Sequence, residues 1–198
     1  MQMIDLRGAW EIIERPLTDG AEAAVAVQEC DANLEGVVPG DVNDSLVRCG
    51  RLPEPLAGVN FREFTWVKQR SWWYRKRFDV PADWGDAKVV DVTLDGLDVH
   101  ADIWLNGVWL GHHRSAFYPF TCDVRKHLKP GEGNVFLVRL TTGQERVPAA
   151  PPDFPLQAVP TEASRGYADR GFKGRVYLRK PAYVWGWDWN PPMPTCGI

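Results

Sequence analysis

Residues 185–192 read Trp-Gly-Trp-Asp-Trp-Asn-Pro-Pro and place one carboxylate among three indoles near the end of the sequence. If this stretch is extended, its side chains alternate between two faces, so the three tryptophans lie on one face and Asp188 lies on the other. The prolines that follow fix φ and remove backbone donors, which ends a strand. The stretch therefore predicts a strand anchored by aromatic rings, which offers one carboxylate across a cleft and then enters a stiff loop.

This combination suits a sugar, whose ring has an apolar C–H face and an edge of hydroxyl groups. A hydrogen bond to a charged carboxylate contributes about 1.5–3 kcal/mol, and more where water is excluded. Buried aromatic residues, however, are more often core than binding surface, so the alternative is that the indoles are sandwich core and Asp188 caps a turn. The candidate substrate-binding residues are Asp188, Trp187, Trp189 and Trp185.

The composition favours an all-β sandwich. The chain has 198 residues, 44% of them hydrophobic, with 10 Trp and 16 Pro. This length supports one domain with a core, and the aromatic-rich and turn-rich balance is more typical of a β-sandwich than of a helical bundle. The net charge of −3 offers no electrostatic footprint for nucleic acid or an anionic membrane, so we expect neither as a partner.

The sequence predicts neither a metal site nor a cofactor. The four cysteines are Cys30, Cys49, Cys122 and Cys196. They are widely spaced and form no C-x-x-C pair, so we expect free buried thiols rather than two disulfides. His112 and His113 are adjacent, and neighbouring residues of a strand point to opposite faces, so the pair is interpreted as loop or edge residues rather than as metal ligands.

The start of the sequence, Met1–Asp5, lacks the basic beginning and apolar middle of a secretory signal. No window approaches the roughly 18 uninterrupted apolar residues that a spanning helix needs. We therefore expect a cytoplasmic protein.

Alternation and turn residues predict a series of short strands. The expected strands are Leu6–Ile13, Ala24–Gln28, Ser71–Val80, Lys88–Leu94, Val99–Leu105, Thr121–Leu128 and Val135–Leu140. We expect Lys88–Leu94 and Val99–Leu105 to pair as core strands. Asn106-Gly107 is the strongest hairpin signal and predicts a type I′ turn.

One short helix is expected near the start of the chain. Pro39-Gly40 predicts a turn, and Asp41 or Asn43 is a suitable N-cap for a helix that runs through Leu46 to Cys49 and is closed by Gly50. Asn60–Lys68 is expected to be weakly helical or irregular.

The strand Ser71–Val80 carries both aromatic and basic residues. Trp72, Tyr74, Lys76 and Phe78 fall on one side, and Trp73, Arg75, Arg77 and Asp79 fall on the other. Basic residues interleaved with aromatic ones are found on nucleic-acid surfaces. Because the whole chain is acidic and has no second basic run, we favour a solvated strand face.

The segment Thr141–Gly174 contains five prolines between Pro148 and Pro160 and predicts few regular elements. A loop of this length in a compact domain is usually functional or disordered. Its polar residues are expected either to line a cleft or to be exposed, and we favour exposure.

The run Tyr177–Trp189 followed by Thr195–Ile198 resembles the end of the N-terminal sugar-binding domain of glycoside hydrolase family 2, and within it the β-mannosidases. Further segments are similar to the family: Val38–Val42, the Trp72-Trp73-Tyr74 strand, and Leu94–Gly111. The resemblance implies an antiparallel jelly-roll β-sandwich of the galactose-binding-domain-like type. It covers most of the chain, from about Trp10 to Ile198.

The resemblance also implies roles for single residues, and this sequence departs from the family's pattern at several positions. Asp188 is expected to bond to hydroxyls of the sugar in a catalytic pocket, with Trp187 as its neighbour at the pocket wall. Ser115 stands where the family has an Asn near the active site, Asn190 replaces a Gly, and Pro192 stands where the family often has an Arg. Arg179 and Lys180 match the family and are interpreted as interface or loop-ordering charges.

In this family both catalytic glutamates lie on a downstream barrel, and one of them follows an Asn. No Asn-Glu dipeptide occurs here, and an eight-stranded barrel alone needs about 250 residues. We therefore expect residues 1–198 to be a single non-catalytic N-terminal domain, ending before its last strand and without the barrel. The expected partners are the protein's own downstream barrel, a mannoside or other glycan, and a second copy bound through an open sheet edge.

Three alternatives remain open at this point. The chain is a stand-alone carbohydrate-binding module with exposed tryptophan platforms, or a pure scaffold whose tryptophans only pack. The third is a parent enzyme that is a β-galactosidase or β-glucuronidase, because these enzymes share the domain. The Gly-Trp-Asp-Trp run favours a β-mannosidase.

Overall fold

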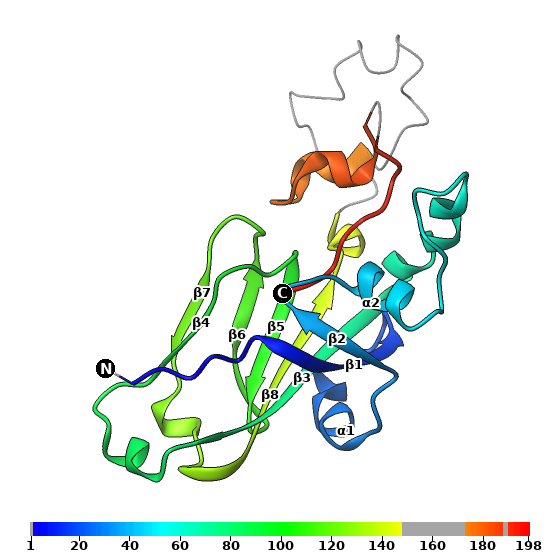
Figure 1. Ribbon diagram of the computed structural model, residues 1–198. Helices are drawn as coiled ribbons and strands as arrows, with labels where there is room; N and C mark the ends of the chain where they lie inside the picture. Colours follow the sequence, from blue (N-terminus) through cyan, green and yellow to red (C-terminus); the bar gives the residue numbers. More distant parts are fainter. Residues whose placement is uncertain (1, 148–172, 188–189) are drawn as a thin grey trace.

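The computed structural model describes residues 2–147, 173–187 and 190–198. Its strands form two antiparallel sheets, one six-stranded with the order β2-β1-β3-β8-β5-β6 and one two-stranded with the order β4-β7 (Figure 1). The larger sheet contains β1 (Gly8–Pro16), β2 (Leu34–Val38), β3 (Arg70–Val80), β5 (His100–Leu105), β6 (Val108–Arg114) and β8 (Gly131–Thr141). The smaller contains β4 (Asp91–Leu94) and β7 (Phe120–Asp123). The expected all-β sandwich is confirmed.

Helical segments are short and lie between strands. The two α-helices are α1 (Ala24–Glu29) and α2 (Val42–Arg48). The 3₁₀ turns are η1 (Ala21–Ala23), η2 (Asn60–Phe64), η3 (Val67–Gln69), η4 (Ala82–Asp86), η5 (Arg125–His127), η6 (Gln144–Arg146), η8 (Lys173–Tyr177) and η9 (Ala182–Trp185). Among the described residues, no helix is both long and apolar enough to cross a membrane.

The main core lies between the two sheets. On β3, Trp72 and Tyr74 face inward and are fully buried, as the alternation of this strand predicts. They pack with residues of the neighbouring strands, and Trp10 meets Phe136 edge-on with ring centroids 6.2 Å apart. The sandwich is therefore organised around aromatic side chains of its central strands.

The outer face of the large sheet is covered by α1. The strand expected at Ala24–Gln28 is wrong, because these residues form a helix whose buried positions, Ala24 and Val27, are three apart. That spacing places both on one helical face, where they pack with Trp73 and Leu137 on the sheet. The alternation that suggested a strand involved Val25, which is instead exposed.

Arg75 ties the end of this helix to the sheet. Its Nη1 donates to the carbonyl oxygens of Val27, Gln28 and Cys30 at 2.8, 2.9 and 2.8 Å, and its Nε donates to Glu11 at 2.6 Å. A guanidinium at a helix C-terminus satisfies carbonyls that have no partner within the helix. The solvated face expected for β3 is therefore wrong at Arg75, which is buried.

The Asn106-Gly107 hairpin is confirmed, with positive φ at both residues (51° and 81°) between β5 and β6. The pairing expected for Lys88–Leu94 with Val99–Leu105 is wrong. β4 pairs with β7 in the small sheet, whereas β5 lies between β6 and β8 in the large one. The chain crosses from one sheet to the other after Leu94, so strands that are consecutive in sequence lie in different layers.

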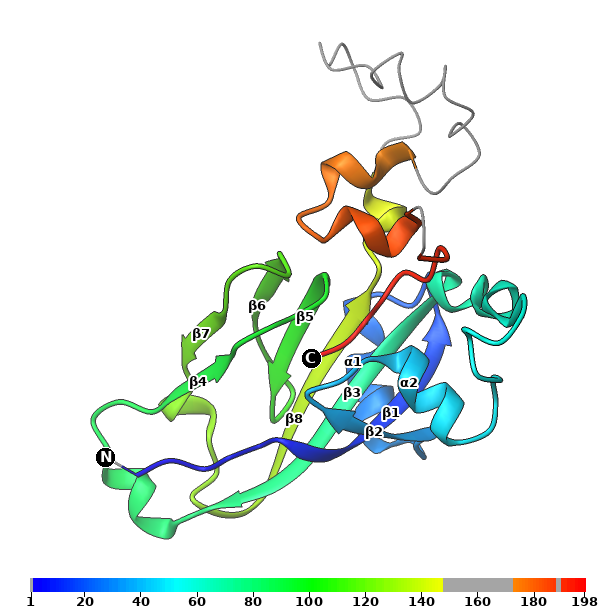
Figure 2. The same ribbon diagram turned by 45° about the horizontal axis from the view of Figure 1, so that its top comes forward.

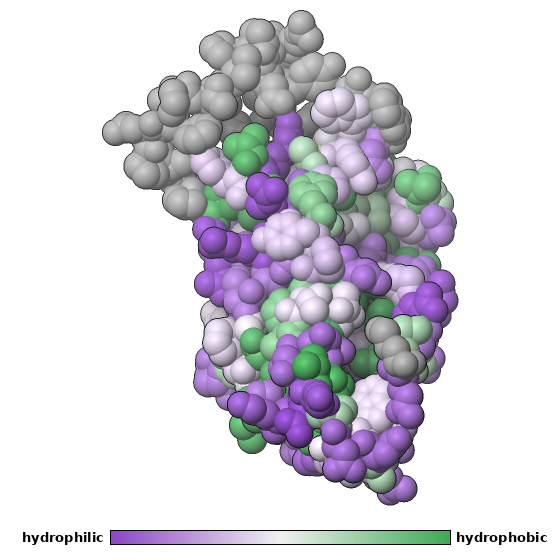
Figure 3. Space-filling view, turned by 90° about the vertical axis from the view of Figure 1, so that its left-hand side faces the viewer, coloured by the Kyte–Doolittle hydropathy of each residue, from purple (hydrophilic) through white to green (hydrophobic). Residues whose placement is uncertain are grey.

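Figure 3 shows the side of the molecule on which the small sheet lies. Hydrophobic side chains reach the surface in the middle of this face, and hydrophilic side chains surround them. Val90, Val92 and Phe120 are partly buried here against the main core. The small sheet thus packs on the main core through these side chains.

The cap predicted for α2 is present, since the Asp41 carboxylate accepts from the backbone N–H groups of Asn43 and Asp44. Next to it, the final residues return to the sandwich (Figure 2). Gly197 forms antiparallel bridges to both Asp41 and Asp98. The four cysteines are free as predicted, but only Cys196 is buried and Cys49 is exposed. The C-terminal segment is therefore held between two loops that are distant in sequence.

Candidate functional site

The tryptophan stretch lies at the end of the sandwich where β8 ends (Figures 1 and 2). The extended conformation expected for it is wrong at its start, because Trp185 ends the 3₁₀ turn η9 and Gly186 has a φ of +113°. A residue with a side chain rarely adopts this conformation, so the glycine permits a sharp change of direction. Asp188 and Trp189 lie outside the described residues.

The change of direction at Gly186 separates the two tryptophans beside it. Trp185 is 2% exposed and packs with Leu178 and Val184 in a small apolar cluster. Trp187 is 51% exposed and faces an open pocket. Trp185 therefore has a packing role, and Trp187 is the tryptophan of this pair that can meet a ligand.

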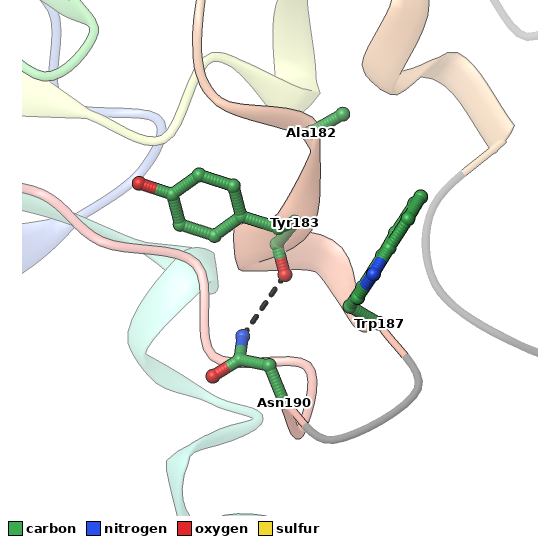
Figure 4. A pocket seen from close by; sticks show the side chains of 4 residues that line it. All are labelled: Ala182, Tyr183, Trp187 and Asn190. Atoms are coloured by element: carbon green, nitrogen blue, oxygen red, sulfur yellow. Dashed lines mark hydrogen bonds between the residues drawn. The ribbon is translucent and has the colours of Figure 1, made fainter.

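The pocket has a volume of about 550 Å³ and is lined by Ala182, Tyr183, Trp187 and Asn190 (Figure 4). This is within the usual size of small-molecule sites. Tyr183 is 58% exposed, so two aromatic rings and one methyl group are offered to a ligand. The lining is largely apolar, which suits the C–H face of a sugar ring.

Asn190 supplies a polar group in this pocket. Its Nδ2 donates to the carbonyl oxygens of Tyr183 at 2.9 Å and of Pro191 at 3.1 Å. Both amide hydrogens are thus used by the protein, and within the described residues the Oδ1 atom is left to accept a hydrogen bond. The residue that replaces the family's Gly therefore adds an acceptor for a hydroxyl.

The segment from Ala182 to Met193 is cross-linked by its own backbone. The Trp187 N–H donates to Asn190 O at 2.9 Å, and the Met193 N–H donates to Val184 O at 3.0 Å. Together with the Asn190 side chain, these bonds connect residues 181–187 with residues 190–193, and we call these two segments the pocket loop. The backbone of its pocket-lining residues is therefore held together by hydrogen bonds within the loop.

The loop 115–118 lies beside the base of the pocket loop. Ser115 is buried and its Oγ accepts from the Phe117 N–H at 3.2 Å, while the Ala116 N–H donates to Arg179 O at 2.9 Å. The hydroxyl that stands in place of the family's Asn is thus used within its own loop. Phe117 and Tyr118 are exposed next to it.

A second cluster of ionisable groups crosses β5, β6 and β8. His100 Nδ1 lies 3.3 Å from His112 Nε2, His112 Nδ1 lies 2.8 Å from Asp102 Oδ1, and Arg139 Nη1 donates to Asp102 Oδ2 at 3.3 Å. Burial opposes ionisation of Asp102, but the hydrogen bond from His112 and nearby positive charge outweigh it and lower the pKa of Asp102. Within the described residues, no group of three or more His, Cys, Asp and Glu could hold a metal ion.

The sequence interpretation missed this cluster, although hairpin register could have found it. Asp102 and His112 are register partners across the Asn106-Gly107 turn, and His100 is two residues from Asp102 on the same face. His112 and His113 do point to opposite faces of the edge strand β6, as predicted. The cluster ties three strands together.

The cluster predicts a pH dependence of stability. Burial lowers the pKa of His100 from 6.5 to about 4, although the carboxylate of Glu145 opposes the shift. The unfolded chain binds the proton more tightly, so this contribution is complete above pH 6.5 and is lost as pH falls toward 4. After a discount for partial exposure of His100, we expect a loss of about 1–2 kcal/mol in the free energy of unfolding.

Urea unfolding at several pH values between 7.5 and 4 measures this effect. His100→Gln should remove the part of the pH slope that belongs to this imidazole. His127→Gln is the matched control, since the His127 imidazole makes no hydrogen bond within the described part of the chain, and it should leave the slope unchanged. Equal slopes in the wild type and in His100→Gln would refute the assignment.

Known proteins with similar sequences indicate the family of this chain. The family described as "Glycosyl hydrolase 2 galactose-binding domain-like" matches residues 19–198. Beta-mannosidase B of Aspergillus niger is 30% identical over 163 residues, which cover 82% of this chain and 18% of the relative. A probable beta-mannosidase of Caenorhabditis elegans is 26% identical over 199 residues, 99% of this chain and 20% of the relative.

Solved structures agree with this match. The beta-D-mannosidase of Dictyoglomus thermophilum superimposes on 100% of this chain with a TM-score of 0.76 and 27% identity, and the match covers 22% of that chain. A β-glucuronidase of Ruminococcus gnavus matches 68% of this chain with a TM-score of 0.52 and 21% identity, which supports the fold alone. This chain spans about a fifth of the length of the curated relatives.

Proposed function

The chain belongs to the glycosyl hydrolase 2 galactose-binding domain-like family, and we propose that it is the non-catalytic N-terminal domain of a retaining glycoside hydrolase that cleaves terminal β-mannosides. Its relatives with the named activity are several times longer than the matched stretch, which leaves room for a catalytic barrel downstream. The barrel then supplies the catalytic carboxylates. This domain packs on the barrel and lends the pocket loop to the sugar site.

The pocket of Trp187, Tyr183 and Asn190 carries the proposal. It is open on one side and combines two exposed aromatic rings with an acceptor oxygen, and Asp188 lies in sequence between its lining residues Trp187 and Asn190. In our proposal Trp187 contacts the apolar face of the sugar, and Asp188 accepts hydrogen bonds from its hydroxyls. Trp189 is proposed as a further wall of the site.

A stand-alone carbohydrate-binding module is the second candidate, because the two exposed rings of the pocket resemble a sugar-binding platform. The two candidates differ in what completes the site. If the barrel completes it, the isolated chain lacks most of the contacts that a monosaccharide needs. If the chain is a module, the pocket binds sugar alone.

Calorimetric titration of the purified chain with mannose, mannobiose and galactose at millimolar concentrations separates the candidates. We expect no heat beyond dilution for any of the three sugars, because an open pocket with few polar groups leaves the sugar largely hydrated. Sub-millimolar binding of a mannoside that is abolished by Asp188→Ala would establish the module instead.

Sedimentation of the same samples tests the self-association that we propose for an open sheet edge.

A further inference from the structure

An ion pair closes the base of the pocket loop. Lys180 Nζ lies 2.8 Å from Asp98 Oδ1, and the Lys180 side chain has 0% exposure while that of Asp98 has 22%. The Lys180 ammonium also donates to the carbonyl of Thr195, whose hydroxyl donates to the other oxygen of Asp98. The two charges thus share a third partner, and the ammonium of Lys180 is removed from solvent.

Lys180 lies on the N-terminal stem of the pocket loop, residues 179–180, and Thr195 lies on the C-terminal stem, residues 194–197. Asp98 lies on the sandwich. Lys180 immediately precedes the loop, and Thr195 follows it after Pro194. Asp98 belongs to the crossing between β4 and β5, and its N–H and carbonyl pair with Gly197 at 3.0 and 3.3 Å. Asp98 therefore holds both stems, one through its side chain and the other through side chain and backbone.

Each stem is also fixed separately to the sandwich. On the C-terminal stem, the Pro194 carbonyl accepts a hydrogen bond from Asn43 Nδ2 at 3.3 Å. The Cys196 carbonyl accepts one from the Tyr74 hydroxyl, also at 3.3 Å. The N-terminal stem is bound by the Arg179 carbonyl to Ala116 at 2.9 Å. The stems are thus docked at different places, and the Lys180–Asp98 ion pair joins them directly beneath the loop.

Because the pocket loop is internally cross-linked, its orientation depends on the distance and angle between its stems. A change at the base moves Trp187 and Asn190 together relative to the sandwich. A buried ion pair with a shared partner fixes geometry better than a single contact, since one carboxylate oxygen lies against the ammonium and the other accepts from Thr195. The ion pair at the base can therefore position the pocket although it does not contact a ligand itself.

We propose that Lys180 and Asp98 are positioning residues for the sugar site: their ion pair sets the orientation of the pocket loop and so the place of Trp187. The statement about the sugar rests on the function proposed above. The orientation of Trp187 does not, because it is a property of this chain alone. The two statements can therefore fail separately.

Fluorine NMR of the chain labelled with fluorotryptophan tests the orientation of Trp187. The Trp187 signal is assigned by its loss in Trp187→Phe. In Lys180→Met, which keeps the length of the side chain without its charge, we expect the Trp187 signal to shift or broaden while the signals of Trp72 and Trp73 keep their native positions. A purely structural ion pair would lower stability and leave the Trp187 signal of the folded protein unchanged.

Arg75→Met is the matched control, since Arg75 is likewise buried and paired with a carboxylate, but lies under α1. It should leave the Trp187 signal in place. If Lys180→Met does not fold, the double variant Lys180→Met with Asp98→Asn removes both charges and leaves no unpaired ion. Its Trp187 signal should still move, and a native signal in either folded variant overturns the proposal.

Kinetics of the longer protein provide the second arm. A displacement of about 1 Å at a site can reduce activity about 100-fold, so Lys180→Met should reduce kcat/KM for an aryl β-mannoside by about that factor, with the Arg75→Met control near wild type. A shifted Trp187 signal with normal kinetics in both Lys180→Met and Asp188→Ala would refute the proposed function and leave the positioning intact. Loss of activity in Asp188→Ala with no effect of Lys180→Met on signal or kinetics would refute the positioning.

Discussion

In the longer β-mannosidase proposed above, replacing Asp188 by alanine should lower kcat/KM for an aryl β-mannoside by about 10- to 100-fold. The reason is that a hydrogen bond between a carboxylate and a sugar hydroxyl contributes about 1.5–3 kcal/mol. The loss should appear in kcat/KM because the proposed function places this contact in the site in which the reaction occurs. Steady-state kinetics of the purified variant measure it.

Asp91→Ala is the control for this prediction. Asp91 is an exposed carboxylate on β4 and makes no side-chain hydrogen bond within the described residues. Its replacement should leave kcat/KM unchanged. Near-normal kinetics of Asp188→Ala would instead support a scaffold domain whose tryptophans only pack.

Lys180→Met should lower the free energy of unfolding of the isolated chain by about 3 kcal/mol. Removing one partner of a buried ion pair leaves the other charge uncompensated, which costs about 3–5 kcal/mol. The lower end applies because Asp98 keeps some exposure and the hydroxyl of Thr195. For a domain of this size the melting temperature should fall by about 6–12 °C, measurable by thermal and urea unfolding.

Two further variants test whether this loss of stability comes from the unpaired charge of Asp98. Lys180→Met combined with Asp98→Asn should recover much of the stability, since it leaves no unpaired buried charge. Arg7→Met breaks the exposed Arg7–Asp5 pair and should leave unfolding unchanged. If Lys180→Met lowers the free energy of unfolding no more than Arg7→Met does, the ion pair at the loop base does not stabilise the domain.

The parts of the fold that were predicted correctly are those that local chemistry determines. Asn106-Gly107 forms its hairpin because both residues accept positive φ, and Asp41 caps α2 because its carboxylate reaches two free N–H groups. The alternation in β3 correctly separated Trp72 and Tyr74 from Trp73 and Arg75, because a strand has two faces. These features depend on a few neighbouring residues.

The errors arose where distant residues determine the structure of a segment, or where a single glycine breaks its pattern. Ala24–Gln28 alternates like a strand, but it forms α1 because the sheet offers an apolar surface for Ala24 and Val27 and because Arg75 binds the last carbonyls. Alternation around Trp185 failed because one residue, Gly186, turns the chain. No spacing rule connects Lys180 with Asp98, so the base of the pocket loop was visible only in three dimensions.

The central claim is that Asp188 reaches a hydroxyl of the sugar from this domain. It is tested most directly by measuring kcat/KM of the wild-type longer protein and of Asp188→Ala on an aryl β-mannoside and on its monodeoxy analogues. If Asp188 bonds to one hydroxyl, the variant should be impaired on the parent substrate but should lose little further activity on the analogue that lacks that hydroxyl. Equal factors of loss on the mannoside and on every analogue would contradict the account.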